Sequence, residues 1–253
     1  MKKLKIILIF IGILFFSFNQ MIAQEASKSQ AFWVHEDPIF PPMAADYEGY
    51  CTDLAVNCKK YNIKDASWFT ISTDDLKYFH ISPIKNMADL DKNRFFDLRQ
   101  KMGNDEFNKL FEGFDNCYDT HSDYIIHLDN ELSYMPQGTS KGQDFRKLEF
   151  WYVTPQNFDK VISIAKSFKE LYSKKNSKEQ YNLYRSGFGS SGDFVLVEIT
   201  AESPEAYERT RKENKELLGE ERNVIYNELL GLITKVETLT GYLRMDLSYI
   251  PEN

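Results

Sequence analysis

Positive charge is in short supply in this sequence. Its 253 residues include 31 Lys and Arg against 38 Asp and Glu, which gives a net charge of −7. Three of the basic residues, Lys2, Lys3 and Lys5, lie within the first five positions, and the rest of the chain is more acidic still. A surface with this excess of negative charge repels phosphate backbones, so we expect no nucleic acid partner.

Cysteine is also scarce, because only Cys51, Cys58 and Cys117 are present, an odd number for a disulfide framework. Cys51 and Cys58 lie in a segment that is predicted to be helical, where seven residues span about 10 Å along the axis. That separation is too long for a disulfide. We therefore predict free, buried thiols, and no metal site, since no His and Cys cluster has the spacing of metal ligands.

Long apolar runs are missing except near the start of the chain. A basic beginning, an apolar run from Ile6 to Phe18 and a short polar stretch ending near Ala23 form the layout of a secretory signal peptide. An uncleaved anchor is the alternative, but the run is shorter than the roughly 20 residues that span a bilayer. We predict cleavage near Ala23 and export to the periplasm or medium, with no stable membrane insertion afterwards.

A nucleotide-binding motif is lacking as well. Gly187 to Gly192 match the pattern G-x-G-x-x-G, but a dinucleotide site needs this loop to open a helix. The residues that follow, beginning at Phe194, have the pattern of a strand. We therefore predict a hairpin turn here.

What the sequence does contain is an internal repeat. Three pairs recur at offsets of 115, 118 and 116 residues: Leu132–Pro136 with Leu247–Pro251, Phe32-Trp33 with Phe150-Trp151, and Gly103 with Gly219. Near-equal offsets in the same order indicate duplication of one unit. We predict a signal peptide (1–23), a first repeat (31–136), a polar linker (137–144) and a second repeat (145–251).

Each repeat is predicted to have the element order βαββαβ. In the first repeat the expected elements are strand 31–35, helix 41–61, strands 66–72 and 77–82, helix 88–118 loosened at Gly103, and strand 124–128. In the second they are strand 148–153, helix 155–173, strands 181–185 and 194–200, helix 204–238 and strand 242–246.

This order predicts an α+β fold of two tandem ferredoxin-like units. Their antiparallel sheets are expected to pack face to face, or to close into a barrel, as a pseudo-dimer. The element order and the duplication resemble the dimeric α/β-barrel superfamily in a tandem, single-chain form. That superfamily includes antibiotic-biosynthesis-type monooxygenases, EthD-like and NIPSNAP-like proteins, and haem enzymes similar to chlorite dismutase. No catalytic motif of these families matches this sequence, so the resemblance assigns no catalytic residue.

Polar and aromatic residues placed within the predicted strands are the candidates for a ligand site, in a chain with 15% aromatic residues. Side chains alternate between the two faces of a strand. If Phe79 and Ile81 face the helices, then Tyr78 and His80 face the space between the sheets. By the same argument, the expected lining is Trp33, His35, Trp68, Tyr78, His80, His127, Trp151, Arg185, Glu198, Tyr242 and Arg244.

Such a lining has two interpretations: paired groups that close the structure, or a ligand cavity. Our first hypothesis is that the protein binds a small aromatic or amphipathic molecule between its sheets, with His80, His127 and Arg244 orienting its polar groups. Alternatives are a cofactor-independent oxygenase with a histidine base and an arginine that stabilises an enolate, haem binding through His80 or His127, and a structural module of the cell envelope. No cofactor is required by the sequence, and whether the protein is an enzyme, and in what oligomer, stays open.

Overall fold

The structure, a computed structural model, describes residues 29–138 and 142–252. The predicted signal peptide lies outside this part of the chain. Eight strands are present in it: β1 (Ser29–Pro38), β2 (Phe69–Thr73), β3 (Lys77–Ile84), β4 (Ser122–Asp129), β5 (Phe145–Val153), β6 (Tyr181–Ser186), β7 (Asp193–Ala201) and β8 (Ile233–Leu243). The helices are α2 (Ala44–Lys60), α3 (Phe96–Met102), α4 (Asn104–Asp115), α5 (Phe158–Lys175) and α6 (Pro204–Leu230).

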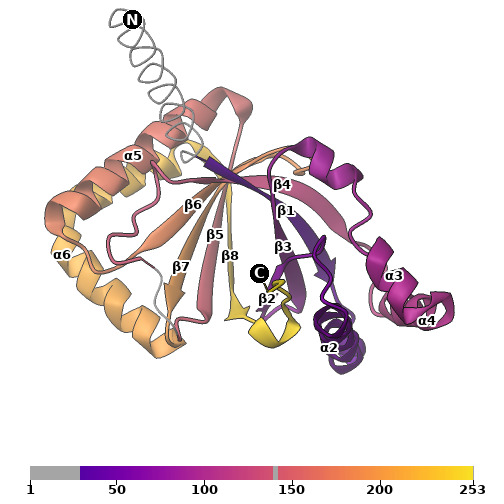
Figure 1. The fold of residues 1–253 in the computed structure, drawn as a ribbon. Coiled ribbons are helices and arrows are strands. Elements are labelled where there is room, and N and C mark those ends of the chain that lie inside the picture. Colours follow the sequence, from indigo (N-terminus) through magenta and orange to yellow (C-terminus); the bar gives the residue numbers. More distant parts are fainter. Residues whose placement is uncertain (1–28, 139–141, 253) are drawn as a thin grey trace, which may run out of the picture.

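The strands form one closed antiparallel barrel in the order β1-β3-β2-β8-β5-β7-β6-β4, and β4 pairs back onto β1 (Figure 1). Two short ladders join the strands of the two halves of the chain. One pairs β2 with β8 around Ser72 and Tyr242, and the other pairs β4 with β6 around His127 and Arg185. Every strand therefore has two neighbours, and the barrel leaves no open edge.

The predicted fold class is wrong. We expected two tandem ferredoxin-like units, each with its own sheet, that pack face to face or close into a barrel. The eight strands instead form a single closed barrel with helices outside it, and no two separate sheets are present in the described part of the chain. The physical reason is that two separate sheets would leave the edges of β2, β4, β6 and β8 with unpaired backbone groups, and pairing across the two ladders satisfies them. The predicted division at residues 137–144 stays a prediction.

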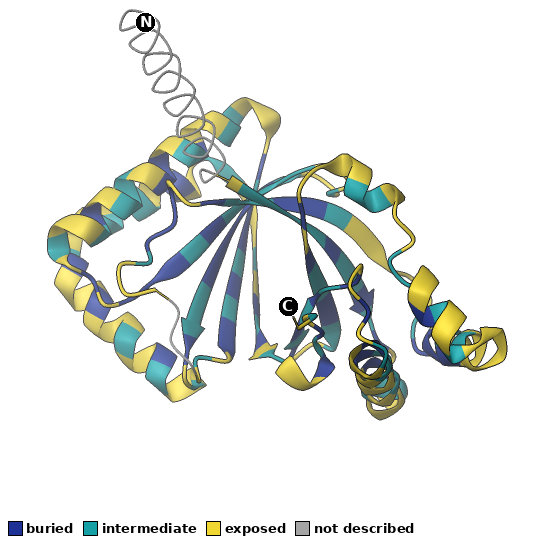
Figure 2. Cartoon of the chain, in the orientation of Figure 1, coloured by how far each residue is buried: buried dark blue, intermediate teal, exposed yellow. Residues whose placement is uncertain are grey.

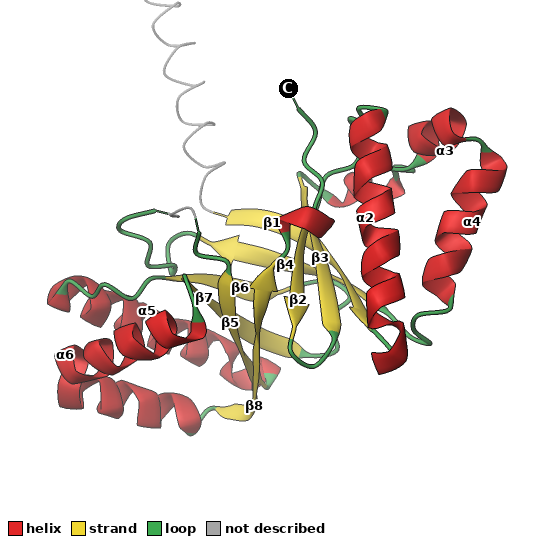
Figure 3. Cartoon of the chain, turned by 90° about the horizontal axis from the view of Figure 1, so that it is seen from below, coloured by secondary structure: helices red, strands yellow, loops and turns green. Residues whose placement is uncertain are grey.

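The helices form two layers on opposite sides of the barrel, as Figures 1 and 3 show. Helices α5 and α6 pack together on one side, and α2, α3 and α4 lie on the other. Their outer faces are exposed while the strands alternate between buried and half-buried positions (Figure 2). Both faces of most strands are therefore covered, one by the barrel interior and one by helices.

The barrel interior is filled by an apolar cluster to which all eight strands contribute. Its buried members are Val34, Ile71, Phe79, Ile126, Leu148, Phe150, Phe194, Leu196 and Leu239, with Tyr184 of β6 among the half-buried residues packed against them. Charged groups lie nearer the ends: Arg146 Nε is 2.9 Å from Glu198 Oε1 at one end, and Lys77 Nζ is 3.0 Å from Glu237 Oε1 at the other. The interior is thus packed, and the open space of the molecule lies elsewhere.

Helix boundaries differ from the predictions in the second half. The predicted helix 204–238 ends at Leu230, and β8 begins at Ile233, well before the predicted strand 242–246. The segment from Ile233 to Thr240 alternates β-branched and polar residues, which favours a strand over a helix. The predicted break at Gly103 is confirmed, because this residue has φ 90° and separates α3 from α4.

The prediction for the thiols is confirmed, since Cys51, Cys58 and Cys117 are all free and buried. The loop Gly187–Gly192 joins β6 to β7 and opens a strand, as predicted. Among the described residues, no helix has the length and apolar character needed to cross a bilayer.

Candidate functional site

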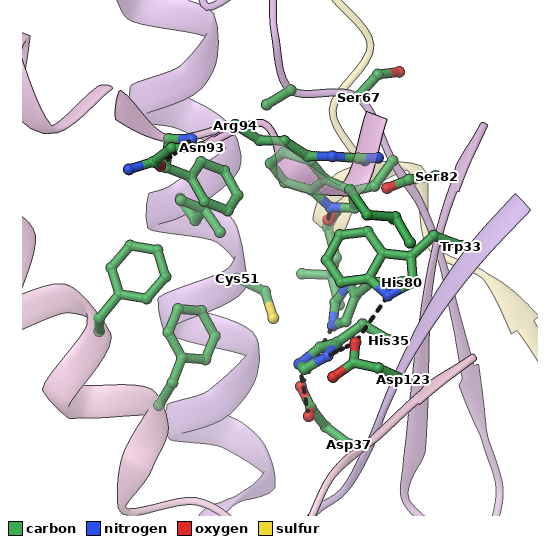
Figure 4. Close-up of a pocket in the computed structure, with 18 of the residues that line it drawn as sticks. Trp33, His35, Asp37, Cys51, Ser67, His80, Ser82, Asn93, Arg94 and Asp123 are labelled. Atoms are coloured by element: carbon green, nitrogen blue, oxygen red, sulfur yellow. Dashed lines mark hydrogen bonds and ion pairs between the residues drawn. The ribbon is translucent and has the colours of Figure 1, made fainter. Parts of the chain in front are cut away.

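The candidate site is a cavity of about 570 Å³ between the barrel wall and the layer of α2, α3 and α4. Its barrel side carries polar residues from β1, β3 and β4, which point toward α2 in Figure 4. Its helix side is apolar, with Cys51 of α2 facing the cavity and aromatic rings from the α3–α4 region around it. A cavity of this size, mostly apolar with a few convergent polar groups, is typical of small-molecule sites.

An acid–histidine–acid cluster forms one part of the polar wall. Asp123 Oδ1 lies 2.9 Å from His35 Nδ1, and it accepts a hydrogen bond of 2.9 Å from the indole nitrogen of Trp33. The other ring nitrogen of His35 lies 3.1 Å from Asp37 Oδ1. Strand alternation explains this grouping, because Trp33, His35 and Asp37 share one face of β1 and Asp123 is the β4 residue opposite His35.

Tyr47 of α2 links this cluster to a second histidine. Its hydroxyl donates a 2.6 Å hydrogen bond to Asp37 Oδ2 and lies 2.7 Å from His80 Nε2. Since an ionised carboxylate only accepts, Tyr47 must donate to Asp37, and we therefore assign the proton of neutral His80 to Nε2. His80 Nδ1 lies 3.0 Å from the hydroxyl of Thr70, whose single proton is shared between this nitrogen and the Leu247 carbonyl oxygen, also 3.0 Å away.

At neutral pH one of the two histidines is charged and the other is neutral. Burial opposes the charge of His35, but its hydrogen bonds to Asp123 and Asp37 outweigh that effect and raise its pKa to about 9. Burial and the nearby charge of His35 lower the pKa of His80 to about 4 and outweigh the raising effect of Asp37, whose Oδ2 lies 4.0 Å from His80 Nε2. The site therefore holds an imidazolium at His35 and a neutral imidazole at His80.

Asp37 is the centre of the network and is 3% exposed. Burial opposes its charge, yet the hydrogen bond and charge of His35, together with the hydrogen bond from Tyr47, hold its pKa below the usual range. Its Oδ2 accepts the hydrogen bond of the Tyr47 hydroxyl, and its Oδ1 lies 3.1 Å from His35 Nε2. Asp37 is thus a buried, charged acceptor among the residues that line the cavity.

Arg94 supplies a second cation to the cavity. Its guanidinium carbon lies 4.8 Å from the centre of the Trp33 ring, and both residues line the cavity. Burial lowers the pKa of Arg94 from its ordinary value. Together with the His35 imidazolium, it gives the cavity two positive groups near which an anion would be stabilised.

Four of the eleven predicted site residues meet in this cavity: Trp33, His35, Trp68 and His80. They face the helices, however, and not the barrel interior. The predicted phase of the strands is wrong, because Phe79 and Ile81 pack inside the barrel while His80 and its outward neighbours lie under α2. A shift of one residue moves every side chain of a strand to its other face.

The other predicted residues are dispersed. Tyr78 donates to Glu48 of α2, Trp151 lies under α5 and α6, and Tyr242 is 41% exposed. His127 and Arg185 are paired neighbours on β4 and β6, and neither lines this cavity. Arg244 binds Glu48 and Asp246.

Glu198 is the one predicted residue that does lie inside the barrel. It forms an ion pair with Arg146 and accepts hydrogen bonds from the Tyr184 hydroxyl and the Asn182 amide. These bonds hold it within the wall of a packed interior.

Sequence reasoning missed Asp37, Tyr47, Asp123 and Arg94. The sequence does contain a signal for Asp37, because it is two residues after His35 and four after Trp33, and so lies on the same face of the strand. Asp123 required the β1–β4 register, Tyr47 required the packing of α2 on the barrel, and Arg94 lies in the loop before α3, so none had a local signal.

Among the described residues there is no group of three or more His, Cys, Asp and Glu side chains arranged to hold a metal ion. The haem hypothesis has little support from the histidines. Both ring nitrogens of His80 are within hydrogen-bonding distance of protein oxygens. His127 lines neither this cavity nor the second large one described below.

Comparison with known proteins finds no matching family model and no matching curated sequence. Solved structures do share the fold. An anthrone oxidase-like protein superposes with a TM-score of 0.58 at 13% identity, covering 86% of this chain and 92% of its own. A candidate monooxygenase from Lactobacillus acidophilus gives 0.52 at 12% identity over 88% and 97%, and one from Fusobacterium nucleatum gives 0.53 at 9% identity over 86% and 93%.

At 9–13% identity these likenesses show a shared fold alone. The predicted resemblance to the dimeric α/β-barrel superfamily agrees with this fold, and the more detailed likeness to NIPSNAP-like and EthD-like proteins stays a prediction. At such low identity the comparison assigns no residue a role.

Proposed function

We propose that the protein is an oxygenase-like enzyme that binds a planar aromatic substrate in the cavity under α2 and removes a proton from it. The observation that carries this proposal is Asp37, a carboxylate only 3% exposed that lines an otherwise apolar cavity. Its partners His35 and Tyr47 lower its pKa and so keep it ionised at neutral pH, and the ionised carboxylate is the form that accepts a proton from an acidic C–H or O–H group.

The surroundings of Asp37 suit each stage of that reaction. Apolar walls that include Trp68, Phe95 and Phe111 provide flat surfaces for an aromatic body. The cations of His35 and Arg94 stabilise the anion that remains on the substrate after the proton leaves. The Tyr47–His80 chain, joined to Asp37 by hydrogen bonds, spreads the charge change over several groups.

Dioxygen is the proposed oxidant. An electron-rich carbanion or phenolate reacts with O₂ directly, and for an anthrone the overall change is R₂CH₂ + O₂ → R₂C=O + H₂O. The fold neighbours support this choice, since one is described as anthrone oxidase-like and two as monooxygenase candidates. Binding of an aromatic molecule, our first hypothesis from the sequence, becomes the first step of this reaction, at a different place in the fold.

The test is O₂ consumption with anthrone as substrate, followed together with anthraquinone formation. We expect one O₂ consumed per anthrone, and a rate at least about a hundredfold lower in Asp37→Asn, which keeps the shape but loses the base. Asp46→Asn is the matched control, because Asp46 is an exposed aspartate of α2 outside the cavity. Equal rates with and without the protein, or an Asp37→Asn variant as fast as the control, would overturn the proposal.

A further inference from the structure

A second cavity of about 570 Å³ lies on the opposite side of the barrel, between its wall and helices α5 and α6. It shares no lining residue with the first cavity. Aromatic rings form much of its wall, among them Trp151 of β5, Phe168 of α5 and Tyr226 of α6. The reaction proposed above makes no use of this space.

A buried carboxylate lines this second cavity with half of its hydrogen-bonding capacity unused. Glu179 is 6% exposed, and its Oε1 accepts hydrogen bonds from the Tyr172 hydroxyl at 2.7 Å and from the Asn214 amide at 3.0 Å. Its Oε2 has no hydrogen-bond partner in the described part of the chain. Buried polar atoms without a partner are rare in native proteins, and each one calls for an explanation such as a ligand.

Tyr181 provides a second group of the same kind. It is also 6% exposed and lines the cavity, and its hydroxyl has no partner among the described residues. The ring of Tyr181 packs edge-on against that of Tyr172 at 5.3 Å, and Tyr172 holds Glu179, so the two unpaired groups belong to one cluster. The charge of Glu179 contributes to raising the pKa of Tyr181, mainly a result of burial, which keeps this hydroxyl protonated.

The chemistry of the two groups limits what fits them. The carboxylate oxygen accepts a hydrogen bond, and the phenol donates one. A hydroxyl group on a ligand satisfies both, because it donates to Glu179 and accepts from Tyr181. An ammonium group cannot accept, and a carboxylate placed here would meet the charge of Glu179 without a proton to offer.

The outer part of the lining is basic on balance. Four basic residues of α6 contribute to it, Arg211, Lys212, Lys215 and Arg222, against the carboxylates of Glu149 and Glu208. Glu208 lies 3.9 Å from Arg211, which leaves the other three basic groups without this partner. Two of the four basic residues lie over aromatic rings of the same cavity, Arg211 at 5.8 Å from the Tyr207 ring and Arg222 at 5.0 Å from the Tyr226 ring. An anionic substituent at the solvent end of a ligand would therefore be favoured.

We propose that the second cavity is a binding site for a hydroxyaromatic acid, with its hydroxyl group between Glu179 Oε2 and the Tyr181 hydroxyl, its ring against Trp151, and its acid toward the basic residues of α6. This site is independent of the first cavity. It gives one chain two aromatic-binding sites on opposite sides of the barrel.

The experiment compares two fluorescent probes, 6-hydroxy-2-naphthoate and 6-methoxy-2-naphthoate, which differ in the ability to donate to Glu179. We expect the hydroxy compound to bind the wild-type protein about tenfold more tightly, since the methoxy compound leaves a buried acceptor unpaired. Glu179→Gln should reduce this preference to less than about threefold. Tyr181→Phe keeps the ring and removes only the hydroxyl, and it should weaken binding of the hydroxy compound about tenfold. This variant still tests the proposal if Glu179→Gln does not fold.

Two control variants locate the effect. Tyr226→Phe removes another hydroxyl from the same cavity, and Asp37→Asn alters the first cavity; both should keep the tenfold preference. Equal binding of the two probes by the wild-type protein would overturn the proposal. A preference that survives Glu179→Gln, or unchanged binding of the hydroxy compound in Tyr181→Phe, would overturn it too. A preference lost in Asp37→Asn would place the probe in the first cavity and would overturn it as well.

Discussion

His35 and His80 lie on neighbouring strands with ring centres 6.3 Å apart, and their pKa values are displaced in opposite directions. His35 has Asp123 on one ring nitrogen and Asp37 on the other, which favours the charged form. His80 is bound by the neutral hydroxyl groups of Tyr47 and Thr70, so burial decides its charge. At the scale of single residues, the hydrogen-bond partners of the ring nitrogens determine whether each imidazole is charged.

This difference predicts a maximum of stability near pH 6.5. For His35 the folded pKa, about 9, lies above the unfolded value of 6.5, so its contribution is complete below pH 6.5 and is lost as the pH rises through 9. For His80 the folded pKa is about 4, so the unfolded chain binds the proton first and stability falls as the pH drops from 6.5 to 4. Each effect amounts to about 3 kcal/mol in the free energy of unfolding.

Urea denaturation between pH 4 and 9 measures the two limbs of this profile, and NMR titration of the imidazole signals assigns them. We expect one histidine to titrate near 9 and another near 4. Two buried histidines that both titrate near 6.5 would show that the charge assignment of the site is wrong.

Part of this residue pattern could be predicted from the sequence. The alternation of Trp33 and His35 marks one polar face of β1, and His80 stands out in β3. The sequence could not show whether these faces point into the barrel or toward the helices. Both faces of the strands are covered, so the alternation of polar and apolar residues does not distinguish the two sides. The groups that complete the site, Asp123 and Tyr47, depend on register and helix packing.

At the scale of elements, the ladder between β2 and β8 is a critical joint. It pairs only a few residues, and Gly241 of β8 faces Thr73 within it. A Cβ atom at Gly241 would collide with the carbonyl oxygen of Ser72 and lie 2.7 Å from the Thr73 Cα. The close approach of two backbones, and not a positive φ, therefore requires glycine here.

We predict that Gly241→Ala lowers the free energy of unfolding by about 3 kcal/mol, at the upper end of the range for overpacked sites. Gly49→Ala serves as the control, since Gly49 lies in α2 with no atom within 4 Å of an added Cβ. That change should stabilise the protein by about 0.5–1 kcal/mol. Thermal denaturation of both variants checks the prediction, and a Gly241→Ala protein as stable as the wild type would contradict it.

Arg244 connects two other elements. Its guanidinium donates to Glu48 Oε1 at 2.5 Å and Oε2 at 2.9 Å, which ties the end of β8 to α2 outside the cavity. We predict that Arg244→Met costs about 1 kcal/mol of stability, as for a partly exposed ion pair, and leaves the affinity for an aromatic ligand unchanged. Thermal denaturation with and without anthraquinone measures both quantities. Loss of the ligand-induced shift in Arg244→Met would contradict the prediction, because it would show that Arg244 contributes to ligand binding.

Element order along most of the chain could be predicted because amphipathic periods and glycine breaks are local signals. The two ladders that close the barrel, β2–β8 and β4–β6, could not be predicted, since they join residues that are far apart in the sequence. The overlong second-half helix had a related cause: the charged pattern of α6 runs on into β8, and only Gly231 and the β-branched residues after it mark the end.

At the scale of the whole molecule, the closed barrel serves as a scaffold that separates two helical layers, each with a cavity beneath it. Its stability depends on the packed interior, including the buried pair of Arg146 and Glu198, whose side chains are 7% and 10% exposed. Removing one member of such a pair leaves an uncompensated charge in the interior.

We therefore predict that Arg146→Met lowers the free energy of unfolding by about 3–5 kcal/mol. The double variant Arg146→Met/Glu198→Gln should recover at least half of that loss, because a neutral amide retains partners in Tyr184 and Asn182. A double-mutant cycle by urea denaturation measures the coupling. Additive effects of the two changes would mean that the pair is not the origin of the loss.

The central claim is that Asp37 takes a proton from an aromatic substrate in the first cavity. The most direct measurement is kcat/KM for O₂ consumption with ordinary anthrone and with anthrone deuterated at its reacting CH₂ carbon. The account predicts that deuterium slows the reaction of the wild-type protein and that Asp37→Asn reacts no faster than anthrone in buffer. Equal kcat/KM values for the two substrates with the wild-type protein, or full activity in Asp37→Asn, would contradict it.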